Sequence, residues 1–314
     1  MARVEAVVAV SESFSETLKV QVVVPTLNAE RTLEKCLTRI LSLDYPNFDV
    51  VVIDGKSRDG TLEICKKLGV NVVQGDFNRS EAYNYALKRF NAEYFAFVDA
   101  DCVVPQGWLS LLLGHMNDEN VGVAGGFYRT PEDVGLWARL VGFELDTRRR
   151  RFQRQITRLP TGCLLIKREA LEKVPFHNGF DTAQETDWGY RLAGAGYTML
   201  YIPEADVLHY HRNSPIAFFK QQYRYGKGII DFYLANRKAI KGDEITSVYM
   251  NIQPLLFLTG LLVPCLLIYW ILLSLYKYTQ THNKLALGLF AVYFLRCLAW
   301  STGLITWLFR KLRK

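Results

Sequence analysis

Two carboxylates one residue apart, placed directly after an apolar run, are the residues of this chain best suited to chemistry. Residues 95–98 are typical of a buried strand, and Asp99 and Asp101 follow them. Open α/β sheets bind ligands beyond the carboxyl ends of their strands, where these side chains would emerge. An Asp-x-Asp pair there is suited to hold a divalent cation that neutralises phosphate oxygens. The alternative is a strand that simply ends in two solvated carboxylates.

The segments before this pair alternate between strand-like and helix-like patterns. Strands are predicted at residues 19–25, 49–54, 71–74 and 93–98, and helices at residues 29–43, from about 61 onward, and at 80–90. This alternation predicts a mostly parallel sheet with right-handed crossovers, an architecture common in nucleotide-binding domains.

Two further groups of polar side chains follow the carboxylate pair. Glu185 and Asp187 stand at the start of a predicted helix, where backbone N–H groups favour negative charge. His209 and His211 stand two residues apart near the last short strand. The elements between these groups are a helix at residues 105–116 and strands at 121–128, 159–166, 197–202 and 206–210.

Composition and charge narrow the class of protein. Half of the 314 residues are apolar, which is high for a soluble chain and indicates membrane segments. The six cysteines show no Cys-x-x-Cys spacing, which suits a reducing compartment without disulfides. Two basic clusters, at residues 148–158 and 310–314, account for the net charge of +7. A membrane surface or a phosphorylated substrate explains such local patches better than a nucleic acid does.

Two long apolar stretches follow an amphipathic one. Residues 215–237 combine aromatic and basic side chains, which is typical of a helix on a membrane interface. Residues 254–276 contain no charge, and residues 285–309 contain only Arg296. At about 1.5 Å per residue, each stretch is long enough to cross a hydrocarbon core of about 30 Å.

A short connector, residues 277–284, predicts that these stretches form an antiparallel transmembrane hairpin with both flanks on one side. Both basic clusters lie on those flanks, so the positive-inside rule predicts a multi-pass protein of the cell membrane with a cytoplasmic catalytic domain. Arg296 is costly in hydrocarbon unless it faces protein, so it marks a helix contact, a homodimer through the membrane helices, or a side chain that snorkels to water. The predicted organisation is a lead-in at residues 1–18, a catalytic domain at 19–213, interface helices at 214–248 and the hairpin at 249–314.

Six motifs, taken in order, resemble those of the inverting family 2 glycosyltransferases of the GT-A fold, over roughly residues 19–228. The resemblance is to membrane-anchored mannosyl- or glucosyltransferases that build polyprenyl- or dolichol-linked glycans. It implies an α/β fold of the GT-A type, a Rossmann-like mixed sheet, with the transmembrane hairpin at its C-terminus. The motifs are V-x-P-x-x-N at residues 22–28, V-V-D-D-G-S-x-D-G-T at 52–61, D-A-D at 98–101, the acceptor-side glycine at 161–162, E-D-x-D-x-x-x-R-L at 184–192 and Q-x-x-R-W at 221–225.

Several positions depart from the family pattern. Gly55 and Lys56 differ from the commonest form of the second motif. Gln184 stands where the family usually has Glu, so that Glu185 falls in the place of the catalytic Asp. Tyr225 replaces Trp in the last motif. These departures leave open a catalytically silent scaffold that uses the same fold to bind a nucleotide.

The resemblance implies a donor site for a nucleotide-sugar at the start of the chain. Asp54 would hydrogen-bond the nucleotide base, with an Asx-turn cap as the alternative. The loop that contains Pro25, Thr26 and Asn28 would cradle the base and the ribose.

The same resemblance implies a metal site for Mn²⁺ or Mg²⁺, ions that hard oxygen ligands and a diphosphate suit. Asp101 would bind the ion directly, and Asp99 would bind the ribose or reach the ion through water. His209 would be a further ligand to the metal or the phosphate, with His211 as the alternative and a purely structural role also open.

Transfer with inversion needs a base that takes the proton of the acceptor hydroxyl. We expect Glu185 in that role and Asp187 as the alternative, although both could merely cap their helix. Gln221 and Arg224 would contact the diphosphate or the acceptor, unless Arg224 snorkels at the membrane surface. Four further residues are candidates for the acceptor side, with core packing or a solvated charge run as alternatives: Gly162, Trp188, Arg148 and Arg151.

The sequence therefore predicts an inverting glycosyltransferase that moves a hexose from a nucleotide-sugar to a lipid-linked acceptor at the cytoplasmic membrane face. Mannose from GDP-mannose is the expected donor, by analogy with the family. A haloacid-dehalogenase-type phosphatase would also carry an Asp-x-Asp after a strand. Two β-α units precede the pair here, and no later Asp-Asp pair follows a strand, which disfavours that class.

Overall fold

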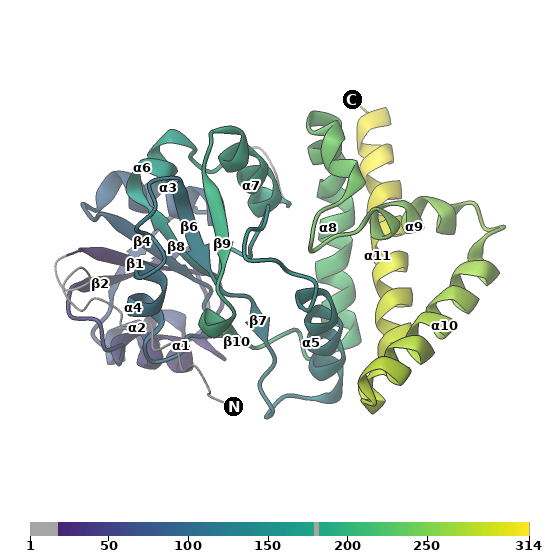
Figure 1. The fold of residues 1–314 in the computed structure, drawn as a ribbon, viewed down its shortest axis with the longest axis horizontal. Coiled ribbons are helices and arrows are strands. Elements are labelled where there is room, and N and C mark those ends of the chain that lie inside the picture. The colour runs from purple at the N-terminus through teal and green to yellow at the C-terminus, as the bar shows by residue number, and fades with distance from the viewer. Residues whose placement is uncertain (1–17, 179–181, 314) are drawn as a thin grey trace, which may run out of the picture.

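Strands from the first two hundred residues form a seven-stranded sheet in the computed structural model, which describes residues 18–178 and 182–313 (Figure 1). Most of the predicted lead-in, residues 1–17, lies outside the described residues. The order across the sheet is β3-β2-β1-β4-β8-β6-β9. The bounds are β1 Val20–Thr26, β2 Phe48–Asp54, β3 Asn71–Gln74, β4 Tyr94–Val98, β6 Val121–Gly125, β8 Cys163–Lys167 and β9 Thr198–Tyr201.

The first four of these strands are parallel, as the β-α alternation predicts. β1 pairs in parallel with β2 and with β4, and β2 pairs in parallel with β3. β8 runs antiparallel to both of its neighbours, β4 and β6, so the sheet is mixed. Because β1, β2 and β4 point the same way, Thr26, Asp54 and Asp99 all reach the carboxyl edge of the sheet.

Side chains alternate between the two faces of the sheet and build a core on each face. Val22 and Val24 of β1 pack in one core, whereas Val23 packs in the other with Phe95 and Phe97 of β4. The helices that cover this sheet are α1 Leu33–Leu41, α2 Thr61–Lys67, α3 Arg79–Arg89, α4 Trp108–Leu113, α6 Arg168–Lys173 and α7 Gln184–Gly194.

A second, three-stranded sheet lies beyond the carboxyl end of β4. Its order is β5-β10-β7, with the bounds β5 Cys102–Val103, β7 Tyr128–Arg129 and β10 Val207–His209. His209 is paired with Cys102 in the antiparallel register of β10 and β5. This pairing brings a histidine from late in the chain next to the Asp-x-Asp pair.

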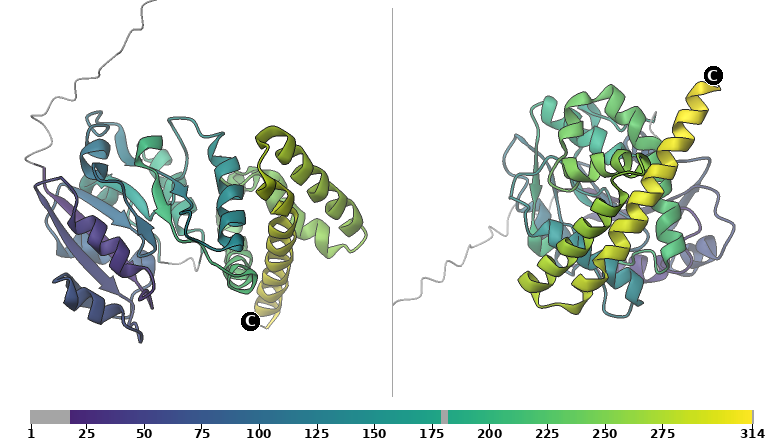
Figure 2. Two further views of the ribbon diagram at one scale, coloured as in Figure 1. Left: turned by 90° about the horizontal axis from the view of Figure 1, so that it is seen from below. Right: turned by 90° about the vertical axis from the view of Figure 1, so that its right-hand side faces the viewer.

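The remaining helices form layers beside the sheet domain (Figures 1 and 2). In Figure 1, α5 and α8 lie nearest the sheets, α11 lies beside α8, and α9 and α10 lie farthest away. The bounds are α5 Leu136–Arg149, α8 Pro215–Ala235, α9 Val248–Leu258, α10 Val263–Thr281 and α11 Leu289–Leu312, with short 3-10 helices η1 Pro203–Ala205, η2 Arg237–Lys241 and η3 Lys284–Gly288.

Glycines bring α8 and α11 into close contact. A Cβ atom on Gly226 would lie 2.5 Å from the Cα of Trp300, and one on Gly303 would lie 2.6 Å from the backbone of Tyr223. Only a residue without a side chain fits at either position, so the backbones of α8 and α11 are in direct contact there.

The stretch predicted as one helix over residues 254–276 is interrupted. α9 ends at Leu258 and α10 begins at Val263, with Gly260 between them at φ +69°. Few residues other than glycine adopt this left-handed conformation, so the chain turns here instead of continuing as a helix. By length and composition, one helix in the described part of the chain, Lys284–Leu312, could cross a membrane. The two-helix hairpin stays a prediction.

Candidate active site

Asp101 and His209 form the centre of a small cluster of metal-ligating side chains. The Oδ1 atom of Asp101 lies 3.3 Å from Nε2 of His209. Together with the thiol of Cys102 they offer ligand atoms that all lie within 4.8 Å of one another. Burial raises the pKa of the Cys102 thiol well above its ordinary value, so the sulfur stays protonated and is a poor ligand. An oxygen and a nitrogen donor remain, a set that suits Mn²⁺.

The surroundings keep Asp101 ionised. Burial by itself would raise the pKa of this carboxyl, but attraction to His209 outweighs burial and holds the pKa below its ordinary value. The ring of Tyr128 stacks on His209 with 4.1 Å between centroids, and Nδ1 of His209 lies 2.7 Å from Nδ1 of His211. Burial lowers the pKa of His211 well below its ordinary value, so this ring is neutral. The cluster is therefore held in place by an aromatic ring and a second imidazole.

Asp99 lies outside this cluster and has partners of its own. Its Oδ2 atom lies 3.7 Å from Nη2 of Arg79 and accepts a 3.4 Å hydrogen bond from the hydroxyl of Tyr128. Its Oδ1 atom is buried with no hydrogen-bond partner among the described residues. A buried oxygen without a hydrogen bond costs free energy unless a ligand donates one. A ribose hydroxyl or a metal-bound water would fit as the donor at this position.

Gly162 makes room for Asp99. A Cβ atom at position 162 would lie 2.5 Å from the carboxyl carbon of Asp99, and the Gly162 carbonyl accepts a 3.2 Å hydrogen bond from the Asp99 backbone N–H. A larger residue would displace the carboxylate. The predicted acceptor-side glycine thus acts on the donor-side carboxylate in this structure.

Asp54 is fully buried, and its carboxylate ties the first two strands together. Oδ1 accepts hydrogen bonds from Thr26 Oγ1 at 2.9 Å and Ser57 Oγ at 2.5 Å, and Oδ2 accepts from Ser57 N at 2.8 Å and Gln74 Nε2 at 2.9 Å. Burial favours a raised pKa for Asp54, but these bonds outweigh it and lower the pKa. Both oxygens are occupied by protein donors, so the predicted contact from Asp54 to a base stays a prediction.

The loop after β1 is held against the loop after β2 by hydrogen bonds from backbone N–H groups to side-chain oxygens. Asn28 sits at φ +52°, its N–H donates to Ser57 Oγ at 2.7 Å, and its Oδ1 accepts from Arg58 N–H at 2.9 Å. Pro25 is the last but one residue of β1. Lys56, one of the departures from the family pattern, forms an ion pair with Asp76 at the surface. These contacts fix the position of the loop relative to the end of β2.

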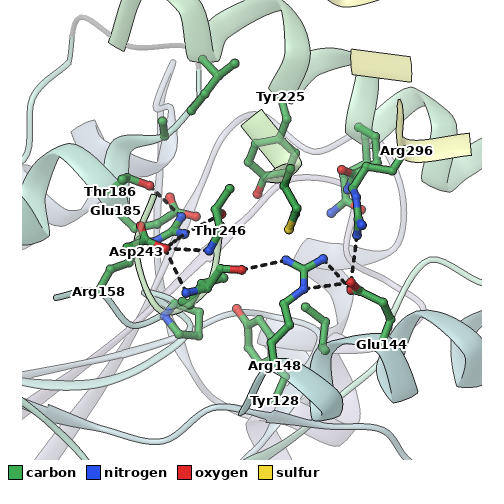
Figure 3. Close-up of a pocket in the computed structure, with 18 of the residues that line it drawn as sticks. Tyr128, Glu144, Arg148, Arg158, Glu185, Thr186, Tyr225, Asp243, Thr246 and Arg296 are labelled. Carbon is green, nitrogen blue, oxygen red and sulfur yellow. Dashed lines mark hydrogen bonds and ion pairs between the residues drawn. The ribbon is translucent and has the colours of Figure 1, made fainter. Parts of the chain in front are cut away.

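A cavity of about 200 Å³ lies between the carboxyl edge of the sheets and the C-terminal helices; we call it the interhelical cavity (Figure 3). Its polar lining includes His209 and Glu185, so one member of the metal-ligating cluster and the predicted base border the same space, whereas Asp101 does not line it. Other residues that line the cavity are Tyr128, Glu144, Arg148, Arg158, Gln221, Tyr225, Asp243, Met250, Arg296 and Trp300.

The two candidate bases differ in their access to the cavity. Glu185 lines it, and among the described residues no side chain hydrogen-bonds or ion-pairs with its carboxylate. Asp187 lies two residues further along α7 and is buried, and its Oδ2 atom accepts a 2.7 Å hydrogen bond from Nε of Arg191. The geometry therefore favours Glu185 as the base and gives Asp187 a structural ion pair.

Trp188 is not available to a sugar. Its ring is fully buried, stacks on Phe176 at 4.5 Å between centroids, and donates through Nε1 to the carbonyl of Val174 at 2.7 Å. The apolar spacing of helix α7 places this ring in the core, which was the alternative to an acceptor contact.

Arginines from two different helices share one buried carboxylate in the interhelical cavity. Glu144 and Arg148 lie on α5, and Nε of Arg148 donates to Oε1 of Glu144 at 2.9 Å. Nη1 of Arg296, on α11, lies 3.1 Å from the same oxygen. All three side chains are more than nine-tenths buried. Burial would raise the pKa of Glu144, but the two arginines outweigh it and lower the pKa.

A second group of polar side chains, centred on Arg158, lies across the cavity, as Figure 3 shows. Arg158 donates to Thr186 Oγ1 at 2.7 Å and pairs with Asp243 at 2.8 Å, next to Glu185. Arg151, predicted on the acceptor side, is exposed and does not line the cavity.

The last predicted motif is divided between the cavity and the surface. Gln221 and Tyr225 of α8 line the cavity, whereas Arg224 is exposed and does not line it. Glu144, Arg158 and Asp243 are three of the six charged Asp, Glu and Arg residues that line the cavity, and none of the three was predicted as a site residue, although Arg158 belongs to the basic cluster at residues 148–158. The only signal for Arg296 was its isolation in an apolar stretch, which indicated a protein contact.

A family model named Glycosyl transferase family 2 matches residues 21–175 of the chain. The matched residues include β1, β2, β4 and β8, and therefore the donor loop, Asp54, Asp99, Asp101 and Gly162.

Two curated proteins are similar over most of their length. Glycosyltransferase AglE of Haloferax volcanii is 26% identical over 236 residues, which cover 71% of this chain and 76% of that protein. A Methanococcus voltae enzyme, dolichyl N-acetyl-alpha-D-glucosaminyl phosphate 3-beta-D-2,3-diacetamido-2,3-dideoxy-beta-D-glucuronosyltransferase, is 24% identical over 266 residues, covering 74% of this chain and 76% of its own.

Among solved structures, the mannosyltransferase PcManGT of Pyrobaculum calidifontis, in complex with GDP-Man and Mn²⁺, has a similar fold. The TM-score is 0.63 at 20% sequence identity, with 92% of this chain and 87% of that chain covered. The similarity extends past the sheet domain into the C-terminal helices and supports the GT-A fold.

Proposed function

This chain is a glycosyltransferase of family 2, and we propose that it transfers a hexose with inversion from a nucleotide-sugar to a lipid-linked acceptor. The observation that carries this proposal is that Glu185 and His209 line one cavity. A base for the acceptor and a ligand for the donor's metal then face each other across a space in which sugar transfer could take place.

The proposed donor half uses the loops at the carboxyl edge of the sheet. The Pro25–Asn28 loop and Asp54 would hold the nucleoside, and the unpartnered oxygen of Asp99 would accept a hydrogen bond from the ribose. When bound by Asp101 and His209, a divalent cation, Mn²⁺ or Mg²⁺, would neutralise the charge of the donor diphosphate. The cation in the PcManGT structure supports this part of the proposal.

Glu185 is proposed to accept the proton of the acceptor hydroxyl while that oxygen bonds to the anomeric carbon. The bond from the anomeric carbon to the diphosphate breaks, and the nucleoside diphosphate leaves with the electron pair. Attack from the side opposite the leaving group gives the inverted product. Among the described residues, no side chain donates a hydrogen bond to the Glu185 carboxylate, so the carboxylate is free to accept the proton of the acceptor hydroxyl.

The acceptor is proposed to be a lipid-linked phosphate that enters the cavity from the side of the C-terminal helices. Glu144 is shared by two arginines, so one positive charge in this buried group is not balanced by it. An anionic acceptor bound beside Arg148 and Arg296 would balance that charge. The name of the Methanococcus voltae relative, which includes a dolichyl phosphate, supports an acceptor of this class.

Mannose from GDP-mannose is the proposed donor, supported by the ligand in the PcManGT structure, and a cytoplasmic membrane face is the proposed location. The experiment is to incubate detergent-solubilised protein and Mn²⁺ with a panel of nucleotide-sugars and membrane lipid extract, and to measure nucleoside diphosphate release. We expect release with one donor, lost with EDTA and in Asp101→Asn. Metal-dependent nucleotide binding without release from any donor would instead indicate a silent nucleotide-binding scaffold.

A further inference from the structure

The helix with the length to cross a membrane lies along a helix that cannot enter one. α11 and α8 run side by side, with Trp300 Nε1 donating to Gln222 at 2.9 Å, Tyr223 donating to Thr306 at 3.1 Å and Lys311 paired with Asp231 at 3.1 Å. α8 also carries the exposed side chains of Lys220 and Arg224. Because a helix with this many charges is not stable in hydrocarbon, α11 has to remain at the same depth as α8.

The connector between α10 and α11 touches the sheet domain. In the structure, residues 282–288 join α10 to α11, and most of them belong to η3. η3 packs on α5, and a Cβ atom on Gly288 would lie 2.6 Å from the side chain of Leu140. In a spanning hairpin, this connector would lie on the far side of a hydrocarbon core of about 30 Å. Contact with Leu140 is incompatible with that separation.

The Arg296–Glu144 ion pair fixes the middle of α11 to the same domain. This 3.1 Å contact joins the long apolar helix to α5, which stands between β7 and β8 in the chain. α11 is therefore held along its length by α5 and α8, which lie between it and the sheets (Figures 1 and 2).

Exposed apolar side chains run along α9 and α10 and over the end of α11, and among the described residues they are most exposed at the tip between α9 and α10. Leu261 is 87% exposed, and Leu258, Leu262, Ile268 and Leu272 are exposed around it. Residues 248–276 contain no charged side chain, and the tip points away from the sheet domain in Figure 1. α9 has 11 residues, about 16 Å, which reaches into one leaflet but does not cross two.

We propose that this protein is monotopic: the α9–α10 hairpin enters one leaflet of a bilayer and returns, and α11 lies in the plane of the membrane surface. The occupant of the apolar tip is then the acyl-chain region of that leaflet. Basic side chains at the ends of this unit, Lys284, Arg310 and Arg313, are exposed where they would meet anionic headgroups. The inference replaces the expected two-span hairpin and does not depend on the donor or acceptor proposed above.

Cysteine labelling with a membrane-impermeant maleimide separates the two topologies. Asn283→Cys places a thiol in the connector, and Lys66→Cys places one on the exposed face of α2 in the sheet domain. The variants are compared in spheroplasts and in inverted membrane vesicles of the expression host. The unaltered chain, in which Cys265 is the exposed cysteine among the described residues, gives the background.

A monotopic protein labels at positions 66 and 283 in the same preparation and at neither position in the other. Labelling of position 283 in spheroplasts, with position 66 labelled in inverted vesicles, overturns the proposal. Trypsin provides a test without substitution, because Lys284 is exposed in the connector. We expect cleavage after Lys284 in inverted vesicles, and cleavage there in spheroplasts alone would also overturn it.

Discussion

Glu185 and Asp187 lie two residues apart on one helix, yet their surroundings prepare them for different roles. Glu185 opens into the interhelical cavity, whereas Asp187 is buried against Arg191. The motif predicts that one of the two is the base, and their burial decides between them. A residue pattern fixes the register of a helix only to within a few positions, so the choice needed the structure.

The first prediction separates rate from stability at these two positions. Glu185→Gln removes the proposed proton acceptor but no protein contact, so we expect kcat to fall by about 10²–10⁴ with an unchanged melting temperature. Asp187→Asn leaves Arg191 without its carboxylate, so we expect a loss of about 1–3 kcal/mol in unfolding free energy. Nucleoside diphosphate release and calorimetry measure the two effects. Equal loss of rate in Asp187→Asn at full stability would contradict the assignment.

Arg148 and Arg296 illustrate a site that sequence reasoning could half predict. The basic cluster predicts Arg148 on the acceptor side. Arg296, which shares Glu144 with Arg148, lies about 150 residues later in the chain, and no local sequence pattern can reveal that contact. Glu144, which joins the two arginines, stands in a segment for which the sequence predicted no element. Tertiary contacts between distant helices carry this part of the site.

The second prediction concerns the affinity for a lipid phosphate. Arg296→Gln removes one of the two proposed phosphate donors, so we expect KM for a polyprenyl phosphate acceptor to rise about 10-fold or more, with donor binding unchanged. Arg310→Gln, an exposed position on the same helix, is the matched control. Glu144→Gln should have the opposite effect on KM, because it frees both arginines, while it lowers thermal stability. A parallel loss of stability and acceptor affinity in Glu144→Gln would indicate a purely structural ion pair.

At the scale of elements, the buried strands and the long helices α8 and α11 were predictable, whereas α5 and the break between α9 and α10 were not. Continuous apolar runs bounded by turn residues predict β1, β2 and β4, because buried parallel strands need no other signal. The break at Gly260 was missed, because apolar composition alone does not distinguish one long helix from two that meet at a glycine. α5 was not predicted at all, since its basic C-terminal turn resembles a solvated charge run.

The third prediction tests the close contact of α8 with α11. Gly226→Val would place side-chain atoms within 2.5 Å of the Trp300 Cα position, so the helices must separate. We expect a melting temperature several degrees lower, because overpacking costs about 1–3 kcal/mol, and a loss of acceptor affinity larger than the loss of donor affinity. Gly194→Ala is the control, since nothing lies within 4 Å of a Cβ atom there. An unchanged melting temperature in Gly226→Val would show that the two helices do not pack as described.

At the scale of the whole molecule, the GT-A fold followed from the order of strands and motifs, and the relation of the C-terminal unit to the membrane did not. Hydropathy measures whether residues 285–309 could lie in lipid, but not whether they are held elsewhere by protein contacts. The contacts of Arg296 and Gly288 with α5 are the observations on which the proposed monotopic arrangement rests. The C-terminal helices and the sheet domain together enclose the interhelical cavity. In the proposed monotopic arrangement, a lipid-borne acceptor would reach Glu185 without leaving the bilayer surface.

The most direct test of the account is the mass of the product. Purified protein in detergent is mixed with Mn²⁺, a nucleotide-sugar that it binds and a polyprenyl phosphate, and the lipid is then analysed by mass spectrometry. We predict a lipid heavier by one hexose with the unaltered chain and no such species with Glu185→Gln, although both bind the nucleotide. Formation of the glycolipid by Glu185→Gln at the unaltered rate would contradict the proposed site. Nucleotide binding without any glycolipid from the unaltered chain would contradict the proposed acceptor reaction.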